Sequence, residues 1–297
     1  MKITPQTCLL LLFLWPLPML ADSLVAVNGL NYPVWMERQG QREALSPDMA
    51  LMDGDVVITG ASGRVWLSMA DGSVVKLGQS ATFRIDSVDY DRQQDRDIMT
   101  ATLNVIKGAF RFTTSFFKPR RKTPHQVNIK IGAITAGLRG TDIWGRSSDS
   151  EDFVTLLEGS VMIEAEGEGR AVLSQPLTLY VKKRGRPADP LGRVQEQQVP
   201  ILAAETELSE QLGIVDAKGR YELVLLSSRN EIGILRQQRR IRQQGFYVHT
   251  VPVEIGGETY YRLVLPGLIS LQSASDLSQR LQYELGLKGV WVNNSPR

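Results

Sequence analysis

RVWLSMADGSVVKL, residues 64–77, is the stretch of sequence that indicates the fold most directly. From Val65 to Met69 every second residue is large and apolar. This alternation predicts a strand with one buried face, because successive strand side chains point to opposite faces. Asp71-Gly72 then predicts a tight hairpin turn, and the chain returns as a second strand that ends at Leu77.

The same alternation recurs between Asp53 and Val181, and no helical period of useful length interrupts it. Many short strands at close spacing predict a sandwich, a jelly roll or a barrel. We place an all-β domain at residues 22–181 and expect a sandwich of jelly-roll-like kind. The further alternating runs are Met99–Val105, Phe110–Phe112, Val127–Ile131, Phe153–Leu157 and Val161–Ile163, with turns at Gly108, Gly132, Gly159 and Gly167.

Several short motifs in this domain occur in a recognisable order. In chain order they are GDVV (54–57), GRVWL (63–67), DGSVVKL (71–77), LRGTDI (138–143), VTLL (154–157) and EGSV (158–161). With them, residues 30–180 resemble the FecR domain. The resemblance implies a periplasmic β-domain that serves interaction or signal reception and not catalysis.

The motif Arg139-Gly140-Thr141-Asp142 is the candidate interaction site of this domain. Gly140 permits positive φ or a close backbone approach, and Arg139 beside Asp142 can form a local ion pair. A structural turn between two strands explains the same residues. The sequence leaves both interpretations open.

Residues 1–21 are predicted to be a secretory signal peptide. Lys2 supplies the positive start, and the apolar run Cys8–Leu20 is shorter than the roughly 20 residues that span a bilayer. Ala21 fits the small residue before a cleavage site. An uncleaved N-terminal anchor is the alternative. Cleavage leaves a chain without cysteine and without a stable membrane span, which favours export to the periplasm.

Composition excludes several other classes of protein. The chain has 297 residues, Lys+Arg 34 against Asp+Glu 32, one cysteine and 42% hydrophobic residues. The apolar fraction is too high for a disordered chain, and one cysteine excludes a disulfide scaffold or a cysteine zinc site. Near-neutral charge argues against a nucleic-acid binder. We therefore expect no metal, no cofactor and no nucleic-acid partner.

Two charge clusters have ordinary explanations. The aspartates between Asp86 and Asp97 lack the glycine and the terminal glutamate of a calcium loop, so we expect a solvated hairpin tip. The basic loop at 118–122 can contact anionic wall polymers or phospholipid headgroups, or can simply be exposed. His125 and His249 are expected in different domains, and no motif pairs a nucleophile with a base. We expect no enzyme activity.

Residues 182–219 break the β pattern. Glu196–Gly213 is rich in Glu, Gln, Ala and Leu, with Leu208 and Leu212 four residues apart. This composition predicts a linker that contains a short helix.

Residues 220–297 predict a small α+β module in the order βαββαβ, a ferredoxin-like plan. Pro252 cannot donate to a strand ladder, so the second strand should lie at the sheet edge. Asn230 and Ser270 are expected to cap the two helices. The expected strands are 221–227, 246–255, 258–265 and 289–292, and the first helix follows Asn230 through Gln244.

The motifs YYRLVL (260–265), PGL (266–268) and VWV (290–292) resemble the second half of the SPOR domain, over about residues 219–293. The resemblance implies binding to septal peptidoglycan, preferably to glycan strands stripped of stem peptides. Leu225 stands where the family usually has Gln, and Ser228 keeps the family's Ser. Trp291 can stack on a sugar ring or be a strand-edge aromatic, and Tyr261 can belong to the core. The predicted glycan-binding residues are Leu225, Ser228, Tyr261, Arg262 and Trp291.

These expectations combine into a non-enzymatic periplasmic protein of the cell envelope, with a role in cell division. The SPOR-like module would bind peptidoglycan, and the FecR-like domain would bind envelope proteins or receive a signal. The alternative is an envelope scaffold or signalling protein whose C-terminal module binds protein rather than glycan.

Overall fold

The computed structural model describes residues 23–92, 97–114, 125–138 and 140–294. The predicted signal peptide at 1–21, the basic loop at 118–122 and Arg139 lie outside these residues. Most of the described chain is β-sheet, with a few helices. Within these residues, no helix has the length and apolarity that a bilayer crossing requires.

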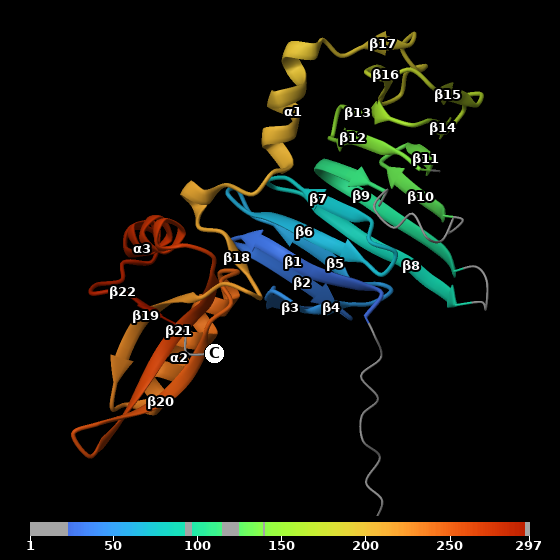
Figure 1. The fold of residues 1–297 in the computed structure, drawn as a ribbon. Coiled ribbons are helices and arrows are strands. Elements are labelled where there is room, and N and C mark those ends of the chain that lie inside the picture. Colours follow the sequence, from blue (N-terminus) through green and yellow to red (C-terminus); the bar gives the residue numbers. More distant parts are fainter. Residues whose placement is uncertain (1–22, 93–96, 115–124, 139, 295–297) are drawn as a thin grey trace, which may run out of the picture.

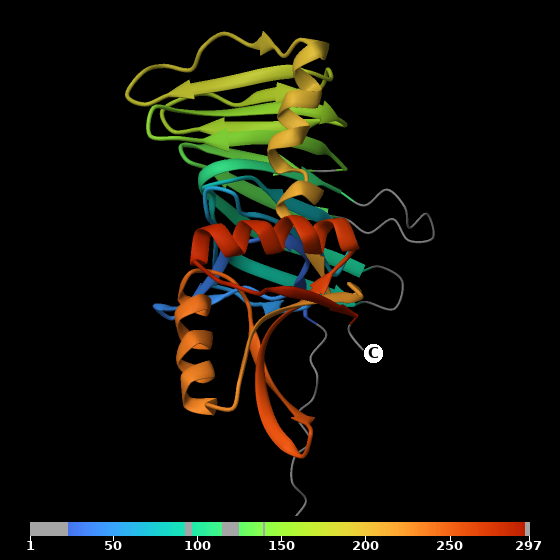
Figure 2. The ribbon, with the colours of Figure 1, turned by 90° about the vertical axis from the view of Figure 1, so that its left-hand side faces the viewer.

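Residues 25–193 form two β-sheets that bury a common apolar core, with strands stacked from β1–β4 at one end to β15–β17 at the other (Figures 1 and 2). The first sheet contains, in spatial order, β4 (Ala50–Leu51), β1 (Val25–Asn31), β6 (Arg64–Met69), β7 (Val74–Leu77), the second half of β9 (Asp97–Thr113), β12 (Asp142–Ser147), β13 (Glu151–Glu158), β16 (Thr178–Lys183) and β17 (Gly192–Arg193). The second contains β3 (Gln41–Ala44), β2 (Val34–Arg38), β5 (Val56–Thr59), β8 (Thr82–Arg92), the first half of β9, β10 (His125–Ile131), β11 (Ile134–Leu138), β14 (Val161–Ala165) and β15 (Ala171–Leu173).

The hairpin predicted from residues 64–77 is confirmed as β6 and β7. Val65 lies opposite Leu77 in the antiparallel register, and both side chains are buried. The Asp71 carboxylate accepts a hydrogen bond from Ser73 N–H at 2.8 Å, and Gly72 has the positive φ of 87° that the turn requires. Local turn chemistry and strand alternation therefore agree at this point of the fold.

Strand β9 crosses from one sheet to the other. Up to Lys107 it pairs with β8 of the second sheet, and from Gly108 onward it pairs with β12 of the first. Gly108 has φ 94°, and a Cβ there would lie 2.5 Å from the Cα of Ala81. A side chain has no room at this corner, so glycine permits the bend that joins the two layers.

The predicted linker is packed against both domains. It contains η1 (Glu196–Gln198), α1 (Val199–Thr206), η2 (Glu210–Leu212) and β18 (Val215–Asp216). Strand β18 pairs with β1 on one side and with Leu268 on the other. Leu208 lies beyond the helix end, and Leu212 lies in η2, so the two leucines do not share one helix face as their spacing suggested.

The C-terminal module has the βαββαβ order that the sequence predicts. Its elements are β19 (Tyr221–Ser228), α2 (Glu231–Gln243), β20 (His249–Ile255), β21 (Glu258–Leu268), α3 (Leu271–Leu285) and β22 (Trp291–Asn294). The strands lie in the order β22-β19-β21-β20, and all the pairs are antiparallel.

Three local predictions in this module agree with the structure. Asn230 and Ser270 cap α2 and α3 through their side-chain oxygens. Pro252 lies in β20, which pairs only with β21 among the described residues. The ends of the strands differ from the prediction: β20 begins at His249 rather than 246, and β21 continues through Pro266 to Leu268.

The two domains contact each other through the residues that follow β1. Val34 N–H donates to the carbonyl of Gly245 at 3.0 Å, and the Arg280 guanidinium of α3 donates to the carbonyl of Tyr32 at 2.6 Å. The buried Tyr32 ring packs on Phe246, with 5.6 Å between ring centroids. The module is therefore held against the β-domain by specific contacts as well as by the chain that connects them.

Candidate functional site

The sheet of the C-terminal module has one face covered by α2 and α3 and one face without helices (Figure 2). Side chains directly opposite each other in antiparallel strands share a face. Leu223, opposite Leu265, belongs to the buried cluster that α2 and α3 complete. Arg262 and Trp291 are offset from these residues by odd numbers of positions along β21 and β22, so both belong to the helix-free face.

Trp291 and Arg262 form a pair on the helix-free face. The Arg262 guanidinium lies over the indole ring, 5.8 Å from its centroid, and Trp291 remains 40% exposed. Arg262 Nε is buried and has no hydrogen-bond partner among the described residues. An exposed indole flanked by a donor-rich cation offers an apolar plane and hydrogen bonds together, which is the combination a sugar ring needs.

Polar groups surround this pair on the same face. Asn293 donates to the Glu222 carboxylate at 2.8 Å, from the strand next to it. His249 lies opposite Val264, and its Nδ1 is buried without a hydrogen-bond partner among the described residues. Burial lowers the pKa of the His249 imidazole, while the nearby Glu222 opposes that shift. The face therefore carries donors, acceptors and one partly buried imidazole.

Three of the predicted glycan-binding residues do not lie on this face. Leu225 is fully buried in the hydrophobic core. Ser228 lies opposite Tyr261, and its Oγ accepts a hydrogen bond from Asn230 N–H at 3.1 Å. Tyr261 lies on the face that α2 covers, and the carboxylate of Glu231 in that helix raises the pKa of Tyr261. The structure thus brings Arg262 and Trp291 together and separates them from the other three.

A β-bulge in β19 decides on which face Ser228 lies, whereas Leu225 reaches the core without it. The register of β19 against β21 shifts between Val224 and Leu226, so one extra residue is inserted there. Leu225 lies two residues after Leu223, so simple alternation puts both on the helix-covered face, and both are fully buried. Beyond the bulge, Ser228 is turned to that same face, opposite Tyr261. Glu222, His249 and Asn293 were not predicted as site residues. Side chains two positions apart in a strand lie on the same face, so counting in steps of two from Trp291 and Arg262 was the available signal for these residues.

The described residues of the FecR-like motif form part of the framework of the β-domain. Asp142 is buried and accepts two hydrogen bonds from Arg111, at 3.0 Å and 2.6 Å. Thr141 is fully buried, and Gly140 has φ 65°. A Cβ on Gly159 would collide with the Gly140 carbonyl. Asp142 therefore pairs with a neighbouring strand, and these contacts favour the structural interpretation of the motif.

The described residues contain no cluster of three or more potential metal ligands. In the aspartate-rich stretch, Asp86 is paired with Arg84 and lies 3.9 Å from Lys130. Polar and aromatic side chains converge on the helix-free face, and charged and apolar side chains converge in a cleft under α1.

The fold and this face define a class of protein: an all-β domain joined to a small α+β domain that exposes an aromatic–cation pair on an open sheet. Residues 55–162 match the family model of the FecR protein, and residues 217–293 match that of the SPOR domain. The chain contains a FecR domain followed by a SPOR domain.

Comparison with solved structures and curated proteins adds little. Two crystal structures of a proposed anti-sigma factor from Parabacteroides distasonis are similar to this chain, at 12% sequence identity and a TM-score of 0.38. Each match covers 81% of this chain and 99% of the other. A likeness this low defines neither the fold nor the role of the present chain. No curated protein matches it.

Proposed function

We propose that this protein binds the glycan strands of peptidoglycan through the helix-free face of its SPOR domain. The exposed Trp291 beside Arg262 is the observation that carries the proposal. The indole supplies a surface for a sugar ring, while Arg262, Asn293 and Glu222 supply hydrogen bonds around it. The match to the SPOR family supports the same ligand class.

Sedimentation with isolated cell walls tests this proposal. The mature chain is incubated with intact sacculi and with sacculi treated with an amidase, which removes stem peptides. We expect more protein to sediment with the treated walls. Trp291→Ala should abolish most of the sedimentation, because stacking of an aromatic ring contributes about 1 kcal/mol or more. Equal and negligible sedimentation with both wall preparations would contradict glycan binding.

Tyr283→Ala is the matched control for this experiment. Tyr283 is an aromatic residue of the same domain and is 91% exposed, but it lies on α3. Its loss should leave sedimentation unchanged. Equal loss in both variants would show that any exposed aromatic residue suffices, and would remove the helix-free face from the proposal.

The remaining parts of the proposal concern location and the FecR domain. We propose that the chain is exported to the periplasm, acts at the cell envelope during division, and has no enzyme activity. The FecR domain would bind an envelope protein or receive a signal. The jelly-roll-like and ferredoxin-like folds remain the proposed descriptions of the two domains, supported by the layered sheets and by the β22-β19-β21-β20 order.

A second candidate function is protein binding by the C-terminal module within an envelope scaffold. Ile232 of α2, together with Leu271 and Tyr283 of α3, exposes large apolar surface on the helices. Crosslinking in cells, with partners identified before and after wall digestion, separates the two functions. Partners that persist after digestion and are lost in Ile232→Ser favour the scaffold. Partners lost on digestion favour glycan binding.

A further inference from the structure

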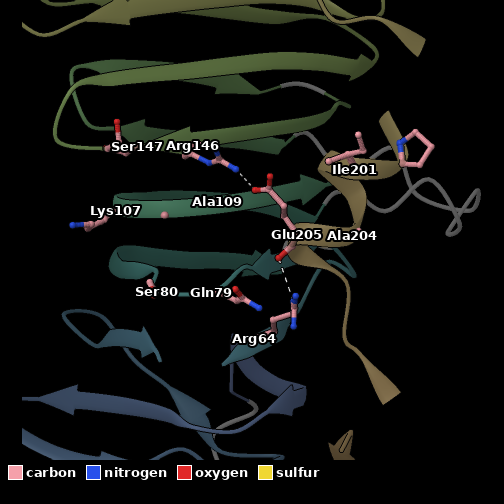
Figure 3. Close-up of a pocket in the computed structure, with 13 residues that line it drawn as sticks. Arg64, Gln79, Ser80, Lys107, Ala109, Arg146, Ser147, Ile201, Ala204 and Glu205 are labelled. Carbon is pink, nitrogen blue, oxygen red and sulfur yellow. Dashed lines mark hydrogen bonds and ion pairs between the residues drawn. The ribbon is translucent and has the colours of Figure 1, made fainter. Parts of the chain in front are cut away.

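Helix α1 lies over the outer face of the first sheet of the β-domain and leaves a cleft of about 880 Å³ beneath it (Figure 3). Pro200, Ile201 and Ala204 of α1 form an apolar wall, and Gly108 and Ala109 at the β9 corner lie opposite. The volume is within the range of about 300–1,000 Å³ that is typical of small-molecule sites.

Hydrogen bonds and ion pairs attach the C-terminal end of the helix to the sheet. Glu205 pairs with Arg146 of β12, and Trp66 Nε1 donates to the carbonyl of Thr206 at 3.3 Å. Glu207, just beyond the helix, pairs with Lys76 at 2.6 Å. Over the described residues, no side-chain hydrogen bond or ion pair joins 199–202 to the sheet. Polar contacts therefore hold the C-terminal end of the helix, whereas Ile201 near the other end is largely exposed.

The side chains that line the cleft leave an excess of positive charge. The lining contains three cations, Arg64, Lys107 and Arg146, and one carboxylate, Glu205. Lys107 has a weak partner, the highly exposed Asp149 at 3.4 Å. Because Glu205 is already paired with Arg146, Arg64 and Lys107 have no ion-pairing carboxylate within the lining, and an anion that enters the cleft meets their positive charge.

Arg64 is the most confined of these cations. Its Nε donates to the carbonyl of Glu205 at 3.3 Å, and its Nη1 is buried without a partner among the described residues. Burial lowers the pKa of the Arg64 guanidinium, because the charged form has lost hydration. A charge in a low-dielectric setting acts over a longer distance than one in water. Arg64 thus strengthens the positive potential in the cleft without needing to contact an occupant.

The cleft also exposes apolar surface. Ile201 is 63% exposed near the N-terminal end of the helix, next to Pro200. The guanidinium of Arg146 is fixed by the rings of Trp144 and Phe153, 5.4 Å and 5.8 Å from their centroids. An oriented guanidinium and an ammonium with one exposed partner therefore lie at one side of the cleft, and an exposed isoleucine lies at the other.

We propose that this cleft binds a small amphipathic organic anion, with a carboxylate or phosphate head near Lys107 and Arg146 and an apolar body against Ile201 and Pro200. Guanidinium and ammonium groups bind both kinds of head through charge-assisted hydrogen bonds. The site belongs to the FecR domain and does not depend on glycan binding by the SPOR domain.

Calorimetric titration of the mature chain tests this proposal with four probes: hexanoate, hexyl phosphate, inorganic phosphate and 1-hexanol. We expect one molecule of hexanoate or hexyl phosphate to bind with a dissociation constant of about 1 mM or lower. A preference for one of the two identifies the head group. Inorganic phosphate and 1-hexanol, which carry the head or the body alone, should each bind at least about tenfold more weakly.

Three variants locate the binding. Lys107→Met and Ile201→Ser should each weaken binding of the preferred probe by about tenfold, and both residues are exposed enough for the fold to tolerate the change. Arg170→Met, which removes an exposed arginine paired with Glu164 outside the cleft, should leave binding unchanged. Absence of binding by both amphipathic anions, equal binding of 1-hexanol, or full binding by both cleft variants would overturn the proposal.

Discussion

Gly245→Ala is predicted to loosen the contact between the two domains, and Gly286→Ala provides its matched control. Both glycines follow a helix C-terminus and have positive φ, 85° and 64°. They differ in their surroundings. A Cβ on Gly245 would lie 2.6 Å from the Trp35 ring and 2.8 Å from Pro33 Cβ, whereas a Cβ on Gly286 meets nothing within 4 Å.

The magnitude follows from this difference. Alanine at positive φ costs about 1–2 kcal/mol at either position. At Gly245 the clash adds the cost of overpacking, about 1–3 kcal/mol. The required shift also strains the hydrogen bond from Val34 N–H to the Gly245 carbonyl at 3.0 Å and that from Trp35 Nε1 to the Gln243 carbonyl at 3.1 Å. We expect Gly245→Ala to lower the free energy of unfolding by about 2–5 kcal/mol and Gly286→Ala by about 1–2 kcal/mol.

Urea unfolding, followed by circular dichroism and by tryptophan fluorescence, measures both variants. Because the altered contact joins two domains, Gly245→Ala should also separate the transitions that the two signals report. Gly286→Ala should lower the midpoint without separating them. Equal losses of stability in the two variants would refute the inference that Gly245 is packed between the domains.

Three further predictions concern single residues. Asp142→Ala should lower the free energy of unfolding by about 2–3 kcal/mol, since it removes both hydrogen bonds to the half-buried Arg111 and leaves it with the longer ion pair to Glu207 at 3.7 Å. Asp142→Asn, which keeps one acceptor, should cost less in the same denaturation assay. The pKa of His249 is lower in the folded chain than the unfolded value of about 6.5. Folding stability should therefore decrease as the pH falls below about 7, and a pH series of melting temperatures should lose this component in His249→Gln. Leu225→Gln, which introduces the residue usual in the SPOR family, should destabilise the chain by about 2–4 kcal/mol, because it buries an amide in the core, and sacculus sedimentation should not increase.

Local patterns in the sequence were sufficient for much of the secondary structure. The alternation around Val65 and the turn at Asp71-Gly72 act between neighbouring residues, so they predicted the β6–β7 hairpin correctly. The caps at Asn230 and Ser270 and the edge position of Pro252 are local in the same sense. Each depends on the hydrogen-bonding capacity of one residue and not on distant contacts.

The candidate glycan site was predicted only in part. Arg262 and Trp291 lie together on the helix-free face, but Tyr261 is directed to the helices and Leu225 is in the core. The bulge in β19 moved Ser228 to the helix-covered face, and a bulge arises from the pairing of two strands that are far apart in sequence. Spacing along a single strand carries no information about such a shift.

The sequence by itself determined the two domain families, the order of elements and the residues that start, turn and end them. Those features depend on interactions within a few residues of one another. Only the tertiary structure decided that β9 pairs with strands of both sheets and that α1 covers a positively charged cleft. It also decided that Tyr32 and Gly245 make contacts between the two domains. These features join residues more than a hundred positions apart or depend on register, and their energies arise only when the chain has closed the corresponding loops.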